Sequence, residues 1–256
     1  MFRILTRIVR KAQFILTKKL RANYNKIEDD NYPMVIKLRS NGCYIAKDFA
    51  HNNIAANKII HFFNEFKKTK EFADELNKIN EQSRYKYRSK LTKFFDRNLL
   101  LQYAEDIFFI KNIQQYMGLA PKVRLIDVWL DKPVSEEFQK YSQLYHRDHD
   151  DFFMIKTFLC LTEIRESNGP LQYVQASHID PWKNLRNQHT DSDVEEVLYP
   201  NKKIFSMTGS QGDMYAADTN GFHKGKTLTE GIRCLVSVQY VSENPRIPFK
   251  DDKFQF

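Results

Sequence analysis

The chain has 256 residues, of which 42% are hydrophobic and 28% are charged. This apolar content excludes a disordered chain and a collagen-like or low-complexity chain, because it is enough for a sizeable core. The three cysteines lie far apart, which excludes a disulfide scaffold and favours a reducing, cytoplasmic location. No apolar run approaches the roughly 18 residues that span a bilayer, and a chain of this length predicts one domain.

The formal net charge of +8 comes from one segment. Residues 1–27 hold eight basic residues and no Asp or Glu, whereas residues 28–256 hold 32 basic and 32 acidic residues. A surface that follows nucleic-acid phosphates needs a broader excess of positive charge. The sequence therefore predicts no nucleic-acid partner, and residues 1–27 need their own explanation.

Residues 1–27 predict a basic amphipathic N-terminal helix. On a helical wheel, Phe2 and Leu5 share one side with most other apolar residues, while most Arg and Lys residues lie on the other side. Such a helix packs on its own domain with a solvated basic face, lies in a membrane interface or serves as a targeting segment. We keep all three readings. The expected location is therefore cytoplasmic, with peripheral membrane contact through residues 1–27 as an open alternative.

Two short strands are predicted within residues 33–46, on either side of the turn signal Ser40-Asn41-Gly42. The next segment, residues 48–82, predicts a helical region because its apolar residues recur every three or four positions. Asp48 or Asn53 is the expected N-cap at its start.

Residues 84–93 mix Lys and Arg with tyrosines. Single-strand nucleic-acid binders use such mixtures, but a stretch this short is more often a solvated helix edge, or a docking patch for an anionic group of a substrate. A second helical region follows at about 96–117, and Gly118 is its expected stop signal. The helical part of the chain is thus expected at about 48–117.

After Pro121 the pattern changes to short strands rich in β-branched and aromatic residues, with one helix expected near 191–198. This pattern is typical of a sandwich or barrel of antiparallel strands. The β core, at about 121–245, is where we expect any functional site. The predicted strands are Val123–Leu130, Phe152–Leu161, Leu171–Val174, Asp213–Ala217 and Cys234–Val241.

Two His-x-Asp pairs, His146/Asp148 and His149/Asp151, stand just before one of these strands. Residues i and i+2 of a strand share a face, so an imidazole and a carboxylate can reach one metal ion together. A third ligand must come from elsewhere, and His223 follows a predicted strand and a Gly-containing turn. Two histidines and one carboxylate leave open metal positions, as in non-haem Fe(II) oxygenases.

An arginine at the start of the last strand completes this set of candidates. Arg233 precedes the strand Cys234–Val241, and a guanidinium fixed on a barrel strand is suited to bidentate binding of a carboxylate.

Several segments, taken in their order along the chain, resemble the phytanoyl-CoA dioxygenase (PhyH-like) family, and the resemblance covers about residues 42–243. One departure is Gln175-Ala176-Ser177-His178, which lacks the Pro and Gly of the family's usual Pro-Gly-Ser-His. We expect His178 to support a turn. The segments that carry the resemblance are Gly42–Phe49, Tyr145–Asp148, Ile155–Thr162, Asn168–Val174, Ala176–His178, Gly212-Asp213, His223 and Arg233.

The resemblance implies a mainly β fold in which N-terminal helices pack on a double-stranded β-helix (jelly-roll, cupin-like) core, with residues 28–256 as a single PhyH-like dioxygenase domain. It implies Fe(II) held by His146, Asp148 and His223. It also implies 2-oxoglutarate anchored by Arg233, with O2 as co-substrate. Further candidates for contact with 2-oxoglutarate are Gln143 and Lys156, and the loops 176–210 are expected to wall a substrate pocket.

The function implied is hydroxylation of a small-molecule metabolite with release of succinate and CO2. Asp148 favours this outcome, because related halogenases have a small residue in its place. His149/Asp151 falls where the family has a variable loop. The alternative function is a catalytically silent protein of the same fold that acts as a binding or membrane-surface module through its basic helix.

Overall fold

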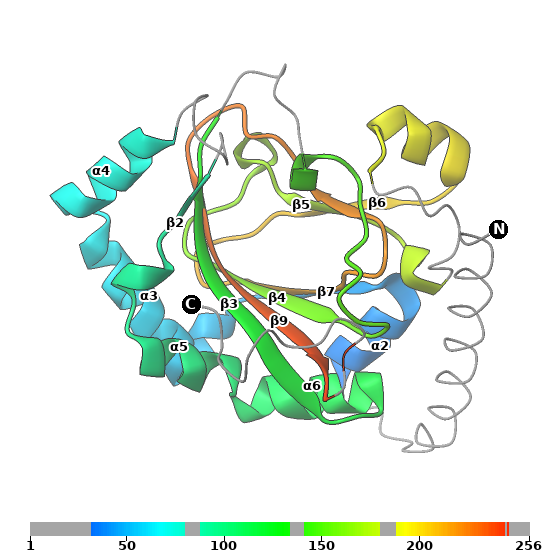
Figure 1. Cartoon of the computed structure of the whole chain (residues 1–256), viewed down its shortest axis with the longest axis horizontal. Helices are drawn as coiled ribbons and strands as arrows, with labels where there is room; N and C mark the ends of the chain where they lie inside the picture. The colour runs from blue at the N-terminus through cyan, green and yellow to red at the C-terminus, as the bar shows by residue number, and fades with distance from the viewer. Residues whose placement is uncertain (1–31, 80–87, 134–140, 180–187, 244, 246–256) are drawn as a thin grey trace.

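The computed structural model describes residues 32–79, 88–133, 141–179, 188–243 and 245 (Figure 1). The basic helix predicted for residues 1–27 lies outside the described residues and stays a prediction. Among the described helices, none combines the length and apolarity needed to cross a bilayer. The α-helices are α2 (Pro33–Asn41), α3 (Ile54–Phe66), α4 (Lys70–Lys78), α5 (Arg97–Ala104) and α6 (Ile107–Met117).

The strands form two antiparallel sheets. The larger has the order β1-β7-β4-β9-β3-β2 and the smaller has the order β6-β5-β8. Three of the β segments, β2, β6 and β8, were not predicted as strands from the sequence. The bounds are β1 (Cys43–Ala46), β2 (Arg88–Lys90), β3 (Pro121–Asp131), β4 (Ile155–Cys160), β5 (Leu171–Val174), β6 (Ile204–Met207), β7 (Met214–Asp218), β8 (His223–Gly225) and β9 (Arg233–Ser242).

The two faces of the six-stranded sheet have different partners. On β4, Ile155 and Leu159 join the core formed with α3, α5 and α6, whereas Lys156 and Phe158 point to the opposite face. This alternation is the period-2 rule for a strand between two layers. Figure 1 shows α3, α5 and α6 along one side of the sheet and β5 and β6 on its other side.

The segment 33–41 is a helix, so the prediction of a strand there is wrong. Pro33 stands at the start of α2, where its missing N–H costs nothing. Gly42 ends the helix with a φ of 85°. The buried residues Met34, Val35 and Leu38 have helical spacing, and their burial outweighs the β propensity of Val35. The strand predicted after the turn is confirmed as β1.

The two predicted helical regions are each divided into two helices. Asn53 is the N-cap of α3, because its side chain accepts a hydrogen bond from the Ala56 N–H. Asp48 stands at the start of the short 3-10 helix Phe49–Asn52, where its side chain makes no capping hydrogen bond. Gly118 ends α6 in the left-handed conformation, as predicted. The expected helix near 191–198 is a π-helical segment, Asp193–Leu198. In the basic stretch, β2 is a strand rather than a helix edge, because its backbone pairs with β3.

Candidate metal centre

The three predicted ligands come together between the two sheets. His146 and His223 form an isolated antiparallel bridge, in which each backbone N–H donates to the other's carbonyl at 3.0 and 3.1 Å. The Asp148 N–H donates to the Thr219 carbonyl at 2.9 Å. The segment that carries the His-x-Asp pair is therefore tied at two points to the turn that leads into β8.

One atom of each side chain points into a shared space. The ligand atoms of His146, Asp148 and His223 all lie within 4.8 Å of one another. Nε2 of His146 is 3.9 Å from Oδ1 of Asp148, and Nε2 of His223 is 3.8 Å from Oδ2. The ring centroids of the two histidines are 4.3 Å apart. Three donors from two separate segments thus face one point.

Backbone carbonyls determine which ring nitrogen of each histidine faces that point. Nδ1 of His146 lies 2.8 Å from the Leu144 carbonyl, and Nδ1 of His223 lies 2.9 Å from the Gly221 carbonyl. A carbonyl only accepts hydrogen bonds, so each Nδ1 carries the proton and each Nε2 keeps its lone pair. Carbonyl partners of this kind orient histidines that bind metals.

The electrostatics favour the protonation states that a metal requires. Burial, followed by the neighbouring His146, lowers the pKa of His223 to about 3, so this imidazole is neutral. Burial raises the pKa of Asp148, but Lys156, His223 and His146 outweigh burial and hold that pKa well below its usual range. Two imidazoles and one carboxylate are a donor set that suits a divalent transition metal, so the residues fit Fe(II).

The alternative pair, His149/Asp151, does not form such a site. Asp151 is buried, and its carboxylate accepts hydrogen bonds from the backbone N–H groups of Phe152 and Ser242, at 2.7 Å each. This carboxylate fastens the loop to the end of β9. Among the described residues, the group of His, Cys, Asp and Glu side chains close enough to share a metal is the one around His146.

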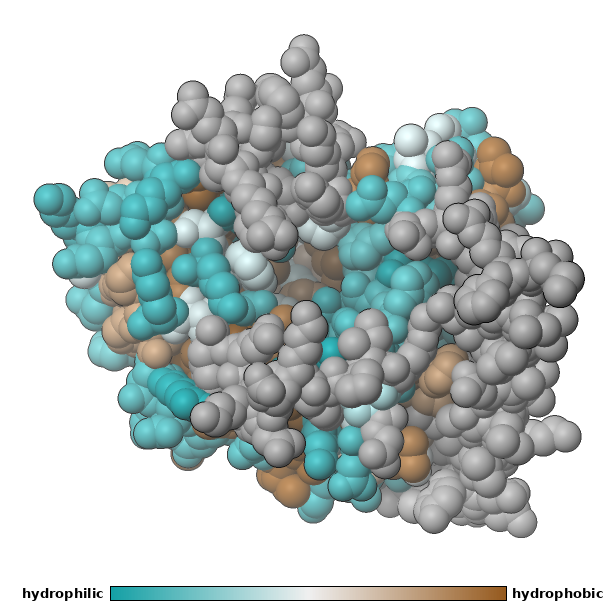
Figure 2. All heavy atoms as spheres, viewed as in Figure 1, coloured by the Kyte–Doolittle hydropathy of each residue, from teal (hydrophilic) through white to brown (hydrophobic). Residues whose placement is uncertain are grey.

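A cavity of about 130 Å³ adjoins the two histidines. Its wall combines apolar side chains with three cations, Arg88, Lys156 and Arg233, and one carboxylate, Asp131. Figure 2 shows one face of the molecule, which is hollowed near its centre. The other lining residues are Trp129, Ser142, His146, Phe158, Leu171, His223, Gly225, Leu235 and Ser237.

Arg233 lies in the cavity wall, as its predicted role requires, but it is held by a partner that the sequence did not indicate. Its Nε donates to Oδ2 of Asp131 at 2.9 Å, while Oδ1 of Asp131 accepts from Nε of Arg88 at 2.9 Å. The Arg88 guanidinium lies 4.8 Å from the ring centre of Trp129. One buried carboxylate thus joins two guanidinium groups, since β3 pairs with both β2 and β9.

The remaining predicted residues divide between the cavity and its surroundings. Lys156 lies in the cavity and contacts Asp148. Gln143 is buried in the short helix just before His146, where Ser142 rather than Gln143 lines the cavity. His178 belongs to a short 3-10 helix and is outside the metal-ligand group. His189 is buried and its backbone pairs with Tyr145.

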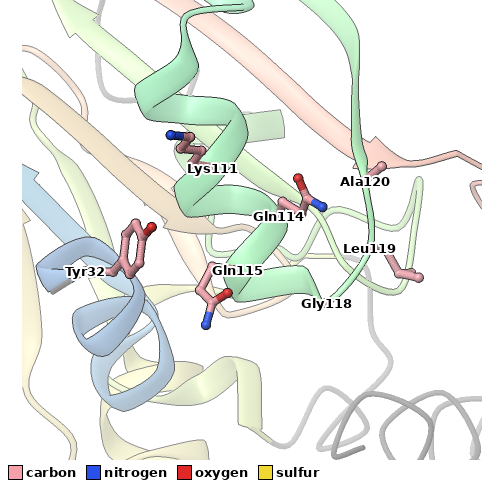
Figure 3. Close-up of a pocket in the computed structure, with 7 residues that line it drawn as sticks. All are labelled: Tyr32, Lys111, Gln114, Gln115, Gly118, Leu119 and Ala120. Atoms are coloured by element: carbon pink, nitrogen blue, oxygen red, sulfur yellow. The ribbon is translucent and has the colours of Figure 1, made fainter. Parts of the chain in front are cut away.

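A second cavity, of about 440 Å³, lies between α2 and α6 (Figure 3). Its lining includes Tyr32, Lys111 and two glutamines, and among the described residues that line it there is no histidine, cysteine or carboxylate. The described lining of the larger cavity thus offers no metal ligand, whereas the smaller cavity adjoins His146 and His223.

No family model matches the sequence, and no curated protein matches it. Solved structures do match. EctD from S. alaskensis with bound Fe is 16% identical with a TM-score of 0.57, covering 86% of this chain and 82% of that one. The non-heme alpha-ketoglutarate-dependent carbocyclase SnoK from nogalamycin biosynthesis is 15% identical with a TM-score of 0.56, covering 89% and 90%.

HygX from Streptomyces hygroscopicus, with nickel and 2-oxoglutarate bound, is 12% identical with a TM-score of 0.54, covering 82% of this chain and 86% of that one. Another HygX structure also contains hygromycin B. At these identities the likeness shows the fold. The chain is mainly β, with helices packed on a double-stranded β-helix (jelly-roll, cupin-like) core, and the predicted fold class is confirmed.

Proposed function

We propose that the chain is an Fe(II)- and 2-oxoglutarate-dependent dioxygenase of the PhyH-like type, with O2 as co-substrate, that hydroxylates a small-molecule metabolite and releases succinate and CO2. One observation carries the proposal: Nε2 of His146, Nε2 of His223 and the Asp148 carboxylate converge on one point, and carbonyls hold both Nδ1 protons. Residues 28–256 would form a single domain around this site.

In this proposal His146, Asp148 and His223 hold Fe(II), and Arg233 binds the second carboxylate of 2-oxoglutarate. The iron would supply activation of O2 for oxidative decarboxylation of the 2-oxo acid and oxidation of a C–H bond. The protein holds the groups that would bind the metal and the 2-oxo acid in fixed positions. The backbone bridge between the two histidines fixes their separation, and Asp131 holds the Arg233 guanidinium in the cavity wall.

The solved structures support the cofactors and the substrate class. The EctD structure contains Fe, the HygX structure contains nickel and 2-oxoglutarate, and a further HygX structure also contains a small molecule, hygromycin B. They also include a carbocyclase, so the fold serves more than one oxidative outcome. Hydroxylation is our proposal because Asp148 keeps the carboxylate that related halogenases lack.

A second candidate function rests on a specific contact. The ammonium of Lys156 lies 2.8 Å from Oδ2 of Asp148, so a cation already neutralises the carboxylate that would bind the metal. A catalytically silent protein of this fold, used as a binding or membrane-surface module, would be stabilised by this pair and would need no metal.

Measurement of bound Fe(II) and of succinate formation separates the two functions. We expect wild-type protein to bind close to one equivalent of Fe(II) anaerobically and to form succinate slowly from 2-oxoglutarate in air, and His146→Ala to do neither. His178→Ala is the control, because it removes an imidazole that lies outside the group of three ligands. A folded wild-type protein that binds no Fe(II) and forms no succinate would contradict the oxygenase and favour the silent module.

A further inference from the structure

Lys156 lies in a constrained position inside the cavity. Its backbone pairs with Ala217 of β7 on one side and with Gln239 of β9 on the other, so the strand cannot shift without breaking the sheet. Because alternate residues of β4 face the helices, the Lys156 side chain is directed to the cavity and is 23% exposed. The six-stranded sheet therefore fixes the position of the Lys156 backbone.

The acceptor that the Lys156 ammonium reaches is also the acceptor that a metal would need. Oδ2 of Asp148 is 2.8 Å from Nζ of Lys156 and 3.8 Å from Nε2 of His223. A divalent ion held by Asp148 and His223 would stand beside this ammonium, and like charges in a partly buried cavity repel strongly. Lys156 and the metal therefore compete for one carboxylate.

The described cavity wall offers Lys156 no good second partner. Asp131 is the one carboxylate among the described residues that line the cavity, and it already accepts hydrogen bonds from Arg88 and Arg233. A displaced ammonium at this depth needs an anion, because an uncompensated buried charge is costly. A bound 2-oxo acid would bring two carboxylates into the same cavity.

We propose that Lys156 is an exchangeable counter-ion that pairs with Asp148 while the three ligands are empty and with a carboxylate of the bound 2-oxo acid once a divalent metal has taken Asp148. This inference rests on the proposed function and adds a positioning residue to it. The exchange makes metal and acid bind with positive coupling, because each removes the penalty that the other meets. A lysine with a purely structural role would give no such coupling.

The test is a thermodynamic cycle with Co(II), which resists oxidation and reports its ligands through visible absorption. We would titrate wild-type protein, Lys156→Met and Lys156→Arg with Co(II), with and without 2-oxoglutarate. Without the acid, Lys156→Met should bind Co(II) about fivefold more tightly than wild type, since the competing cation is gone. The Co(II)-loaded variant should bind 2-oxoglutarate about tenfold more weakly. Lys156→Arg should keep both wild-type affinities within a fewfold range.

Lys90→Met is the matched control. Lys90 is also a strand lysine paired with a buried aspartate, Asp127, at 2.6 Å, but it does not line the cavity. We expect Lys90→Met to leave both affinities unchanged, which separates the exchange from a general loss of positive charge.

In Lys156→Met the affinity for Co(II) should rise and the affinity for 2-oxoglutarate should fall, whereas damage to the fold would lower both affinities. If Lys156→Met binds Co(II) no more tightly than wild type does, the proposed exchange is wrong. The proposed function would still stand in that case, provided that wild-type protein binds both Co(II) and 2-oxoglutarate. Wild-type protein that binds no Co(II) even with 2-oxoglutarate would instead contradict the proposed function itself, and the exchange with it.

Discussion

Asp131 and Arg233 stand opposite each other in the register of β3 and β9, and Nε and Nη2 of Arg233 lie 2.9 and 2.8 Å from Oδ2 of Asp131. Both residues are buried. The contact determines which edge of the guanidinium is held by the protein and which edge can meet a ligand. If Arg233 binds 2-oxoglutarate as proposed, this contact links the stability of the sheet to the recognition of that acid.

Replacement of Asp131 by Ala should lower the stability of the protein strongly. The change leaves the buried Arg233 without its carboxylate and removes the partner of Arg88, so we expect the free energy of unfolding to fall by about 3–5 kcal/mol. Chemical denaturation measures this. Asp127→Ala, which removes an aspartate paired with the more exposed Lys90, should cost less. Equal losses for the two variants would contradict the special role of Asp131.

Arg233→Met should lower the affinity for 2-oxoglutarate and leave the affinity for acids with one carboxylate unchanged. A charge-assisted bond to a carboxylate contributes about 1.5–3 kcal/mol, so the affinity for 2-oxoglutarate should fall by roughly 10- to 100-fold. The comparison ligand is 2-oxobutanoate, which lacks the second carboxylate and should bind both proteins about equally. Calorimetric titration of the metal-loaded proteins gives both values. A similar loss for the two acids would place Arg233 outside the recognition of the second carboxylate.

Fe(II) binding should distinguish the two His-x-Asp pairs. Because His146 faces the common point of the three ligands, His146→Ala should lower the affinity for Fe(II) at least about 100-fold. His149→Ala removes the same side chain three positions later and should retain the metal. Anaerobic dialysis followed by metal analysis measures both variants. If His149→Ala loses iron and His146→Ala retains it, the assignment of His146/Asp148 as the metal-binding pair is wrong.

The helical layer should contribute a pH-dependent part of the stability through Glu75. This buried carboxylate accepts hydrogen bonds from Ser89, Lys78 and Lys93. Burial raises its pKa, but these three partners outweigh burial and lower the pKa from 4.5 to about 2. Since the folded pKa lies below the unfolded one, the ionised group stabilises the protein above about pH 4.5, and this stability is lost as the pH falls towards 2.

Glu75→Gln should therefore be less stable than wild type by about 1–2 kcal/mol at pH 7, a modest value because both lysines are largely exposed. The difference should shrink steadily as the pH falls below 4.5. Urea denaturation between pH 3 and pH 7 measures it. Glu71→Gln, on the exposed face of the same helix, is the control and should show little change. A difference that grows at low pH would contradict the assignment.

Most of the fold was accessible from the sequence because strong local patterns coincide with the tertiary structure. The alternation of Ile155, Thr157 and Leu159 with Lys156 and Phe158 indicates a strand between two layers, and the structure confirms it. The helix Pro33–Asn41 was missed although its signals were present: Pro at the start and Gly just after the end. The β-branched pair Val35-Ile36 suggested a strand, and burial of one helical face decided otherwise.

The contacts around Arg233 could not be predicted in the same way. β2 is three residues long and polar, so only its pairing with β3 makes it a strand, and that pairing brings Arg88 opposite Asp131. The residues are 43 positions apart in the chain, and no local pattern relates them. The three proposed ligands could be selected from the sequence because chemically suited residues occur in an order that resembles the PhyH-like family.

The anaerobic absorption spectrum of the protein with Fe(II) and 2-oxoglutarate tests the central claim most directly. The account predicts a weak visible charge-transfer band that requires both additions, disappears in His146→Ala, and in Arg233→Met needs much more 2-oxoglutarate to develop. Folded wild-type protein that shows no band with Fe(II) and 2-oxoglutarate in excess would contradict the claim that His146, Asp148 and His223 hold iron for a 2-oxo acid.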